Sequence, residues 1–246
     1  HGELVFIANE NEGDDCFFMA LDRKTGKLAW REELAKNPRW ACYSPPFVYQ
    51  PSSGKAVMLV ASAAHGLTAF ELATGKVRWQ ANPGFKNRFV AVPALSGNKL
   101  LVNTGSGNSG KECVVFEMSE GAAAEPKISF RLRRGLPYVP SAIAIGGRFF
   151  LFADSGFASC IEAGSGAELW RERIDGKFFS SPVSNGTSIY ICDREGRLWT
   201  FSKDKFEVLG RFDLGAPICA TPALARGAMF VRTAQELIRL ERVAGK

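Results

Sequence analysis

The stretch of sequence that decides the fold is FMALDRKTGKLAW, residues 18–30. It returns as LTAFELATGKVRW at residues 67–79 and as ASCIEAGSGAELW at residues 158–170. Each copy combines an alternating strand, a turn that ends in glycine, and a second strand with tryptophan four residues after that glycine. Weaker copies occupy residues 113–130 and 198–208. A repeat of strands is therefore the first thing that the sequence shows.

A second element precedes each later copy and contains a proline followed by a short apolar run. The prolines are Pro46, Pro93, Pro140, Pro182 and Pro222, and the gaps between them are 47, 47, 42 and 40 residues. One more short apolar run lies between the two elements, so the unit is predicted to hold four short strands. No segment shows the apolar period of a helix. We predict an all-β fold of four-stranded antiparallel sheets.

Four-stranded units at this period are typical of β-propeller blades, which stack around an axis because one blade cannot bury both of its faces. The sequence is predicted to form a single propeller domain over residues 1–246 with about 5.5 blades, the copies at both ends being incomplete. The approximate copies are 1–40, 41–85, 86–134, 135–176, 177–215 and 216–246.

The three strong copies assign structural roles to their glycines and tryptophans. The glycines are expected to take positive φ in tight turns: Gly26, Gly75 and Gly166. The tryptophans are expected to lie flat between neighbouring blades and to join them: Trp30, Trp79 and Trp170. Trp40 and Trp199 fall outside that register, and Trp40 is predicted to be an exposed contact residue.

Composition excludes several classes of protein. The 246 residues include 46% hydrophobic residues and 19 Phe, which excludes a disordered chain. No apolar run is long enough to cross a bilayer. The net charge of +6 is scattered along the chain, so no nucleic-acid partner is expected. The six cysteines form no Cys-x-x-Cys pair, and we interpret several of them, such as Cys192 and Cys219, as buried small hydrophobic residues, with the disulfide state left open.

Candidate catalytic motifs are few. Residues 105–111 match the Gly-x4-Gly-Lys spacing of a phosphate-binding loop, but Glu112 follows where Ser or Thr would bind magnesium. A strand is predicted after the loop instead of a helix, which favours a hairpin. The chain has two histidines, too few for a histidine-based metal site, and His65 is predicted to lie solvated in a turn. No catalytic or metal-binding residue is assigned.

The pattern Ala-Leu-Asp-x-x-Thr-Gly-x-x-x-Trp at residues 20–30 resembles the repeat of pyrroloquinoline-quinone-type (PQQ-like) β-propellers, over almost the whole chain. Stretches such as 134–141 and 206–209 look most like the PQQ-like repeat proteins of planctomycetes and related bacteria. The architecture is also similar to the cofactor-free propeller lipoprotein of the outer-membrane β-barrel assembly machinery. Such propellers have seven or eight blades, which implies that this chain is the C-terminal part of a longer ring. A closed ring of six blades is the alternative.

Residues 104–108 also resemble the Gly-Thr-Gly-Asn stretch of quinoprotein alcohol dehydrogenases. That likeness would make Asn108 a calcium ligand beside pyrroloquinoline quinone. The adjacent Cys-Cys pair and the haem-attachment motif of those enzymes are missing from this sequence.

We therefore expect a non-catalytic scaffold without cofactor, which presents its top-face loops or channel mouth to a protein, peptide or glycan. One alternative is a fragment of a PQQ- and calcium-dependent dehydrogenase. Another is a sensor domain appended to a module such as a kinase. The resemblance implies a periplasmic or exported bacterial protein, although the chain carries no signal peptide. The ligand and the oligomeric state are left open by the sequence.

Overall fold

Antiparallel strands make up nearly all of the regular structure. The computed structural model describes residues 1–34, 41–107, 109–122 and 124–241. In those ranges the strands form six antiparallel sheets, and the one helical element is the 3₁₀ turn Glu120–Ala122. No helix in the described ranges has the length and apolar character needed to cross a membrane. The predicted all-β fold is confirmed.

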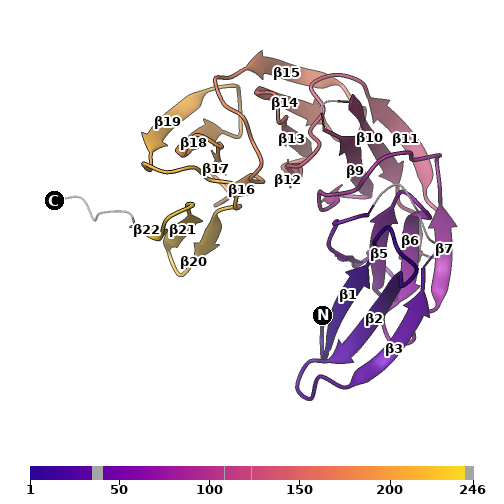
Figure 1. Cartoon of the computed structure of the whole chain (residues 1–246). Coiled ribbons are helices and arrows are strands. Elements are labelled where there is room, and N and C mark those ends of the chain that lie inside the picture. The colour runs from indigo at the N-terminus through magenta and orange to yellow at the C-terminus, as the bar shows by residue number, and fades with distance from the viewer. Residues whose placement is uncertain (35–40, 108, 123, 242–246) are drawn as a thin grey trace. The chain divides into compact units, whose positions relative to one another are not determined.

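The chain divides into two compact units, His1–Leu132 and Arg133–Lys246. In the first unit, each sheet is a meander of strands that are consecutive in the chain (Figure 1). Its first sheet consists of β1 (Leu4–Asn9), β2 (Phe17–Asp22) and β3 (Leu28–Glu33). The second consists of β4 (Phe47–Tyr49), β5 (Val57–Ser62), β6 (Gly66–Glu71) and β7 (Val77–Ala81). The third consists of β8 (Ala94–Ser96), β9 (Lys99–Ser106), β10 (Ser109–Glu117) and β11 (Lys127–Leu132).

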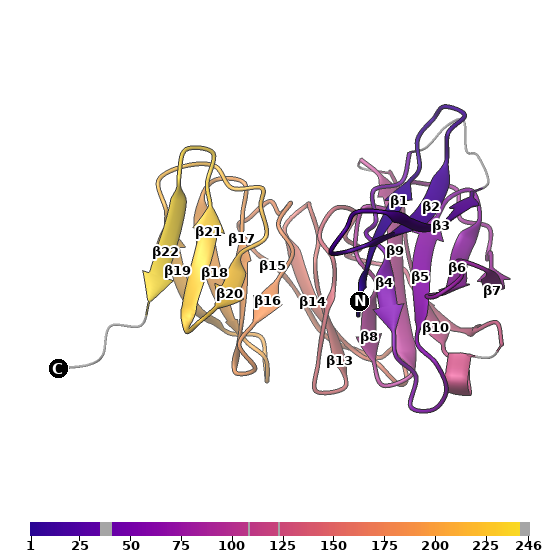
Figure 2. The same cartoon turned by 90° about the horizontal axis from the view of Figure 1, so that it is seen from below.

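The second unit repeats the same meander three more times. Its first sheet holds β12 (Ile143–Ile145), β13 (Arg148–Phe152), β14 (Phe157–Glu162) and β15 (Glu168–Arg173). The next sheet holds β16 (Val183–Ser184), β17 (Ser188–Cys192), β18 (Arg197–Ser202) and β19 (Val208–Asp213). The last described sheet holds β20 (Ala223–Ala225), β21 (Ala228–Arg232) and β22 (Leu237–Glu241). Figure 2 shows the strands of each unit from the side, with turns at both ends of every sheet.

The proline element becomes a short strand at the edge of each of five sheets. These strands are two or three residues long and follow the predicted prolines: β4, β8, β12, β16 and β20. Proline has no N–H to donate, so it is tolerated at the start of an edge strand and not within a central one. The proline positions read from the sequence therefore mark the first strand of these blades.

Hydrogen bonds inside the repeated turn explain its sequence. In the first copy, the Asp22 carboxylate accepts bonds from the backbone N–H of Thr25 (2.8 Å) and from its hydroxyl (2.8 Å), which lower the pKa of Asp22. Glu162 accepts the N–H of Ser165 in the same way, and its pKa is also lowered. The glycine that follows the Thr or Ser has φ between +70° and +78° in all three strong copies. An acidic residue, a hydroxyl residue and glycine are thus the chemistry that this turn needs.

The tryptophans of the outer strands reach the neighbouring sheet. Trp30 donates its Nε1 hydrogen to the Leu72 carbonyl (2.9 Å), and Trp79 donates to the Ala122 carbonyl (3.1 Å). The Trp170 ring lies 5.3 Å, centroid to centroid, from the ring of Phe206. In each case the partner lies in the turn before the outer strand of the next sheet. The energetic role of these tryptophans as blade staples stays a prediction.

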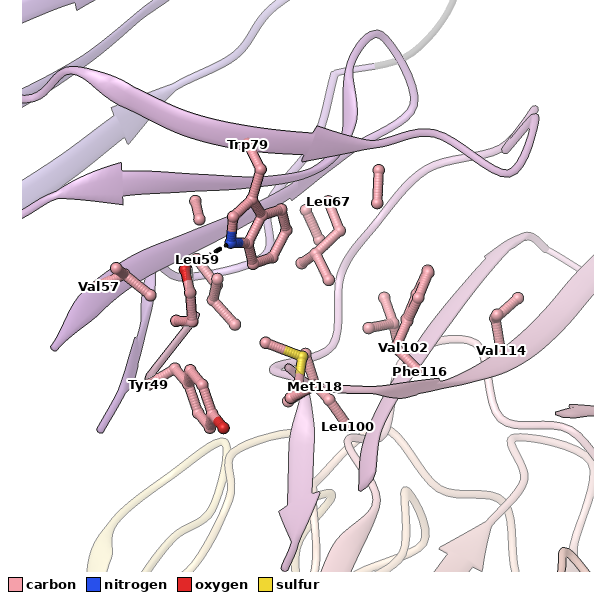
Figure 3. Close-up of a cluster of buried hydrophobic side chains, with 14 of the residues drawn as sticks. Tyr49, Val57, Leu59, Leu67, Trp79, Leu100, Val102, Val114, Phe116 and Met118 are labelled. Atoms are coloured by element: carbon pink, nitrogen blue, oxygen red, sulfur yellow. Dashed lines mark hydrogen bonds between the residues drawn. The ribbon is translucent and has the colours of Figure 1, made fainter. Parts of the chain in front are cut away.

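The main core of the first unit fills the space between its second and third sheets. Figure 3 shows Leu59 and Leu67 near Trp79, and Val102, Val114 and Phe116 in the same cluster. All of these residues are buried. Each of the six sheets falls inside one copy of the repeat, and two of them have three strands in the described residues. That residues 1–246 form one propeller domain stays a prediction.

Candidate functional site

The two ends of every sheet differ in the kind of connection that they carry. Because neighbouring strands run in opposite directions, the turns β1–β2, β5–β6 and β9–β10 lie at the same end as the segments that lead from one sheet to the next. We call this the loop end, and we call the opposite end, which carries the glycine-containing repeat turns, the turn end. In the first unit the described loop end comprises residues 10–16, 41–46, 63–65, 82–93 and 107.

Bonds between successive blades brace the loop end of the first unit. The Ser44 hydroxyl donates to the Ala91 carbonyl (2.8 Å), and the Tyr43 N–H donates to the Phe89 carbonyl (2.7 Å). The buried Thr104 hydroxyl bonds the carbonyl of Arg88 (2.6 Å). The first two bonds join the connecting segments of neighbouring sheets, and the third ties a connecting segment to β9 of the same sheet, so the loops are held in place by the fold.

A buried polar cluster lies beneath these loops. His65 is only 4% exposed, so its predicted solvated position is wrong. Its Nδ1 lies 2.8 Å from the Thr68 hydroxyl, and its Nε2 lies 3.3 Å from Glu10 Oε1. The Ser62 hydroxyl donates to the other oxygen of Glu10 (2.5 Å). The turn folds the imidazole inward because Glu10, supplied by the previous sheet, gives it a polar partner.

The burial of these groups does not fit nucleophilic catalysis. A serine nucleophile needs an imidazole between the hydroxyl and the carboxylate, to take the proton. Thr68, His65 and Glu10 do stand in that order, but the Thr68 side chain is buried, with 2% of the residue exposed, and the Ser62 hydroxyl bonds the carboxylate. No group of three or more His, Cys, Asp or Glu in the described part of the chain is arranged to hold a metal ion. The cluster is best explained as a tie between the first two sheets.

Arginine–aromatic pairs mark the loop end of the first unit. The Arg88 guanidinium lies 5.9 Å from the ring centroid of Tyr43 and 3.5 Å from Glu12. Tyr43 is 59% exposed, although its backbone is bonded to the next connecting segment. Arg31 lies 3.9 Å from the centroid of Phe17, at the same end of the first sheet. An exposed tyrosine on a fixed backbone next to an arginine is thus available to a partner.

The loop end of the second unit carries the same kind of pair. Arg173 lies 5.3 Å from the centroid of Phe157, where β15 ends and β14 begins. Arg194 lies 4.3 Å from the centroid of Phe179. Arginine and aromatic residues are the types enriched in protein–protein interfaces, and a guanidinium stacked on a ring is already ordered before binding.

A buried carboxylate fixes the β17–β18 turn on which Arg194 lies. Asp193 is fully buried and accepts bonds from Arg197 Nε (2.6 Å) and Trp199 Nε1 (2.7 Å). Arg197 also pairs with Asp175 (3.3 Å) and Glu195 (2.6 Å). Trp199 bonds to its own blade, which accounts for its position outside the register of the other tryptophans.

A family model described as "Outer membrane protein assembly factor BamB" matches residues 18–124, 122–209 and 155–246. The chain belongs to this BamB family. A curated relative with the same description, from Burkholderia pseudomallei (strain K96243), is 25% identical over 243 residues. The match covers 94% of this chain and 59% of that protein, so the chain spans about three fifths of the relative's length.

Two solved structures resemble this BamB-family chain in fold. The crystal structure of BamB from Moraxella catarrhalis aligns with a TM-score of 0.53 at 15% identity, and covers 97% of this chain and 81% of that one. The computationally designed Ika8 protein aligns with a TM-score of 0.73 at 11% identity, and covers 98% and 69% respectively. Identities this low are informative about the fold alone. The predicted PQQ-like repeat propeller, with its likeness to an outer-membrane assembly protein, is confirmed.

Two sequence-based candidates lie outside the described residues of this BamB-family chain. They are Asn108, the calcium ligand of the dehydrogenase alternative, and Trp40, the predicted contact residue. The neighbouring strands are described: β9 ends at Ser106 and β10 begins at Ser109. The predicted strand after the glycine-rich loop is thus confirmed, and among the described residues no helix N-terminus faces that loop to bind phosphate.

The cysteines follow the predicted burial with one clear exception. All six are free thiols. Burial raises the pKa of Cys160 to about 11 and of Cys192 to about 12. Cys219, which the sequence placed in an apolar context, is exposed, so its predicted burial is wrong. The preceding Ile218 is fully buried, and neighbouring residues in an extended segment point to opposite sides.

Proposed function

We propose that this chain is a non-catalytic binding scaffold that acts in outer-membrane protein assembly and engages polypeptides through the loop ends of its sheets. The observation that carries the proposal is the set of arginine–aromatic pairs on braced loops, above all Tyr43 with Arg88 and Phe179 with Arg194. Membership of the BamB family supports the biological setting. The same setting supports a location on the periplasmic side of the outer membrane.

The chemistry of the loop end suits a polypeptide partner. Large rigid side chains such as tyrosine contribute contact area at a low entropic cost, and arginine binds carbonyls and carboxylates through several donors. The braced backbone lowers the cost of ordering the loops on binding. The hydroxyl–imidazole pair of Thr68 and His65 is buried beneath the loops, so the exposed side chains of the loop ends support binding.

The proposal is tested with a urea-unfolded outer-membrane protein, diluted into buffer and labelled for fluorescence anisotropy. We expect Tyr43→Ala combined with Arg88→Ala to weaken binding by the 246-residue chain at least tenfold. Lys55→Ala, at an exposed turn-end position, is the matched control and is expected to leave binding unchanged. Equal binding by the loop-end variant and the unaltered chain would overturn the proposal. So would oxidation of an alcohol by the chain reconstituted with quinone and calcium.

A further inference from the structure

The outer strands of the first unit begin with the same pair of exposed residues in all three sheets. Each pair is a lysine followed by an aliphatic residue: Lys27 and Leu28, Lys76 and Val77, Lys127 and Ile128. Leu28, Val77 and Ile128 are 58%, 54% and 45% exposed. Single exposed aliphatic residues are common, but the same register position in three successive sheets is a pattern.

A β-bulge explains why these aliphatic side chains face solvent. The register of each outer strand shifts just where the pair lies: between the partners Ala20 and Leu21, Ala69 and Phe70, and Val115 and Phe116. A bulge adds one unpaired residue, bends the strand and turns its side chains. Because each outer strand begins at the turn end, the pairs lie next to the turns there and opposite the loop end.

The three lysines add positive charge to an end that also carries the carboxylates of Glu3, Asp22, Glu71 and Glu117. Lys27 and Lys76 form no ion pair with any residue in the described ranges. Glu117 pairs with Lys99 (2.9 Å), and its pKa is lowered by Lys99 and also by Lys127, which faces it across the strand pair. Lys55, in the β4–β5 turn, also forms no ion pair with a described residue. Two exposed carboxylates lie near the third pair, at Glu120 and Glu125. The excess of positive charge is consequently greatest on the first two sheets.

The fold does not require lysine at these positions. The second unit has the same register shift before its outer strands, at Cys160/Ile161 and Thr200/Phe201. The lysine position is occupied by Glu207, before Val208, and by Ala167, before Glu168, which pairs with Ile161. Since an equivalent strand start is built with glutamate, the lysines of the first unit are a property of that surface.

We propose that the turn end of the first unit lies against the anionic headgroups of a phospholipid bilayer. The ammonium groups of Lys27 and Lys76 contact lipid phosphates, with Lys127 adding to them, and the aliphatic residues enter the interfacial layer. Lysine is depleted in protein–protein interfaces, where arginine and aromatic residues are enriched, so this composition favours a headgroup layer over a protein partner. The inference is independent of what binds at the loop end.

Vesicle sedimentation tests the proposal with the 246-residue chain. Vesicles of phosphatidylcholine alone are compared with vesicles in which roughly a third of the lipid is phosphatidylglycerol, at low and high salt. We expect binding to the anionic vesicles only, with a loss at high salt. The variant Lys27→Glu/Lys76→Glu is expected to bind at least tenfold more weakly. Its folding is checked by circular dichroism, and Leu28→Ser/Val77→Ser is expected to weaken binding without a change in charge.

The matched control is Lys86→Glu, at an exposed loop-end position of the same unit, and it is compared with the single variant Lys76→Glu, which makes the same change in net charge at the turn end. We expect the control to retain binding within about twofold, because Lys86 lies at the opposite end of the unit from the proposed membrane surface. Equal losses in the two variants would show that net charge alone drives binding, and would overturn the proposal. It is also overturned if the chain binds neither kind of vesicle, or if it binds polyglutamate while ignoring anionic vesicles.

Discussion

The loop end and the turn end of the first unit are built in different ways. At the loop end, side chains from one sheet bond to the backbone of the next, as Ser44 does to Ala91, and each turn has its own sequence. At the turn end, one short motif returns in sheet after sheet, with tryptophan packed on the neighbouring turn. The difference indicates that the residues of the repeat build the blades. The proposed binding surfaces are formed by residues that occur only once, at the loop end, and by residues that differ between copies of the repeat, at the turn end.

The largest expected effect concerns what holds a loop end together. Asp193→Ala leaves Arg197 without its buried partner and Trp199 Nε1 without an acceptor, and we expect it to lower the free energy of unfolding by roughly 3–5 kcal/mol. Urea denaturation measures the loss. Asp175→Ala removes an exposed partner of the same arginine and is expected to leave the midpoint nearly unchanged. A similar loss in both variants would contradict the bracing role of the buried carboxylate.

The second prediction concerns the turn end. Gly75 has φ +74°, and a Cβ there would lie 2.4 Å from a Trp30 ring atom. We expect Gly75→Ala to cost roughly 3 kcal/mol, since positive φ and a clash with the ring add together. Gly26→Ala meets no atom within 4 Å and is expected to cost roughly 1 kcal/mol from its positive φ. Equal midpoints of urea denaturation for the two variants would contradict the claim that the close approach of Trp30 to residue 75 adds to the cost of the substitution.

Most of the fold follows from the sequence because its signals are local. The prolines, the Thr-Gly turns and the tryptophans act within a few residues, so their spacing predicts sheets of consecutive strands. His65 shows where such reasoning fails: its burial depends on Glu10, which lies 55 residues earlier in the chain and in another sheet. The pairing of Tyr43 with Arg88 is equally non-local. Only an exposed tyrosine near a connecting segment could have hinted at it.

A third prediction separates binding from stability at the loop end. Tyr43→Ala/Arg88→Ala removes an exposed ring and a partly exposed guanidinium, so we expect the free energy of unfolding to change by less than about 1 kcal/mol. Binding of an unfolded outer-membrane protein is expected to fall at least tenfold in the same sample. A large loss of stability would mean that these residues hold the loops in place and do not primarily contact a partner.

The smallest effect is expected from thiol chemistry. At pH 8, Cys219 is expected to react first with a thiol reagent such as 5,5′-dithiobis(2-nitrobenzoic acid), because it is exposed. Cys160 and Cys192 are expected to react only after denaturation, since burial raises their pKa values to about 11 and 12 and keeps the thiols protonated. Peptide mapping of the labelled chain identifies the sites. Early labelling of Cys192 would contradict the burial of the β17 strand.

The most direct test of the central claim measures both ends against both partners. The loop-end variant Tyr43→Ala/Arg88→Ala and the turn-end variant Lys27→Glu/Lys76→Glu are each titrated with the unfolded outer-membrane protein and with anionic vesicles. The account predicts that the first variant loses binding to the polypeptide and keeps the vesicles, while the second does the reverse. The assignment of the two ends to two kinds of partner would be contradicted if either variant lost binding to both partners. It would also be contradicted if neither variant lost binding to any partner.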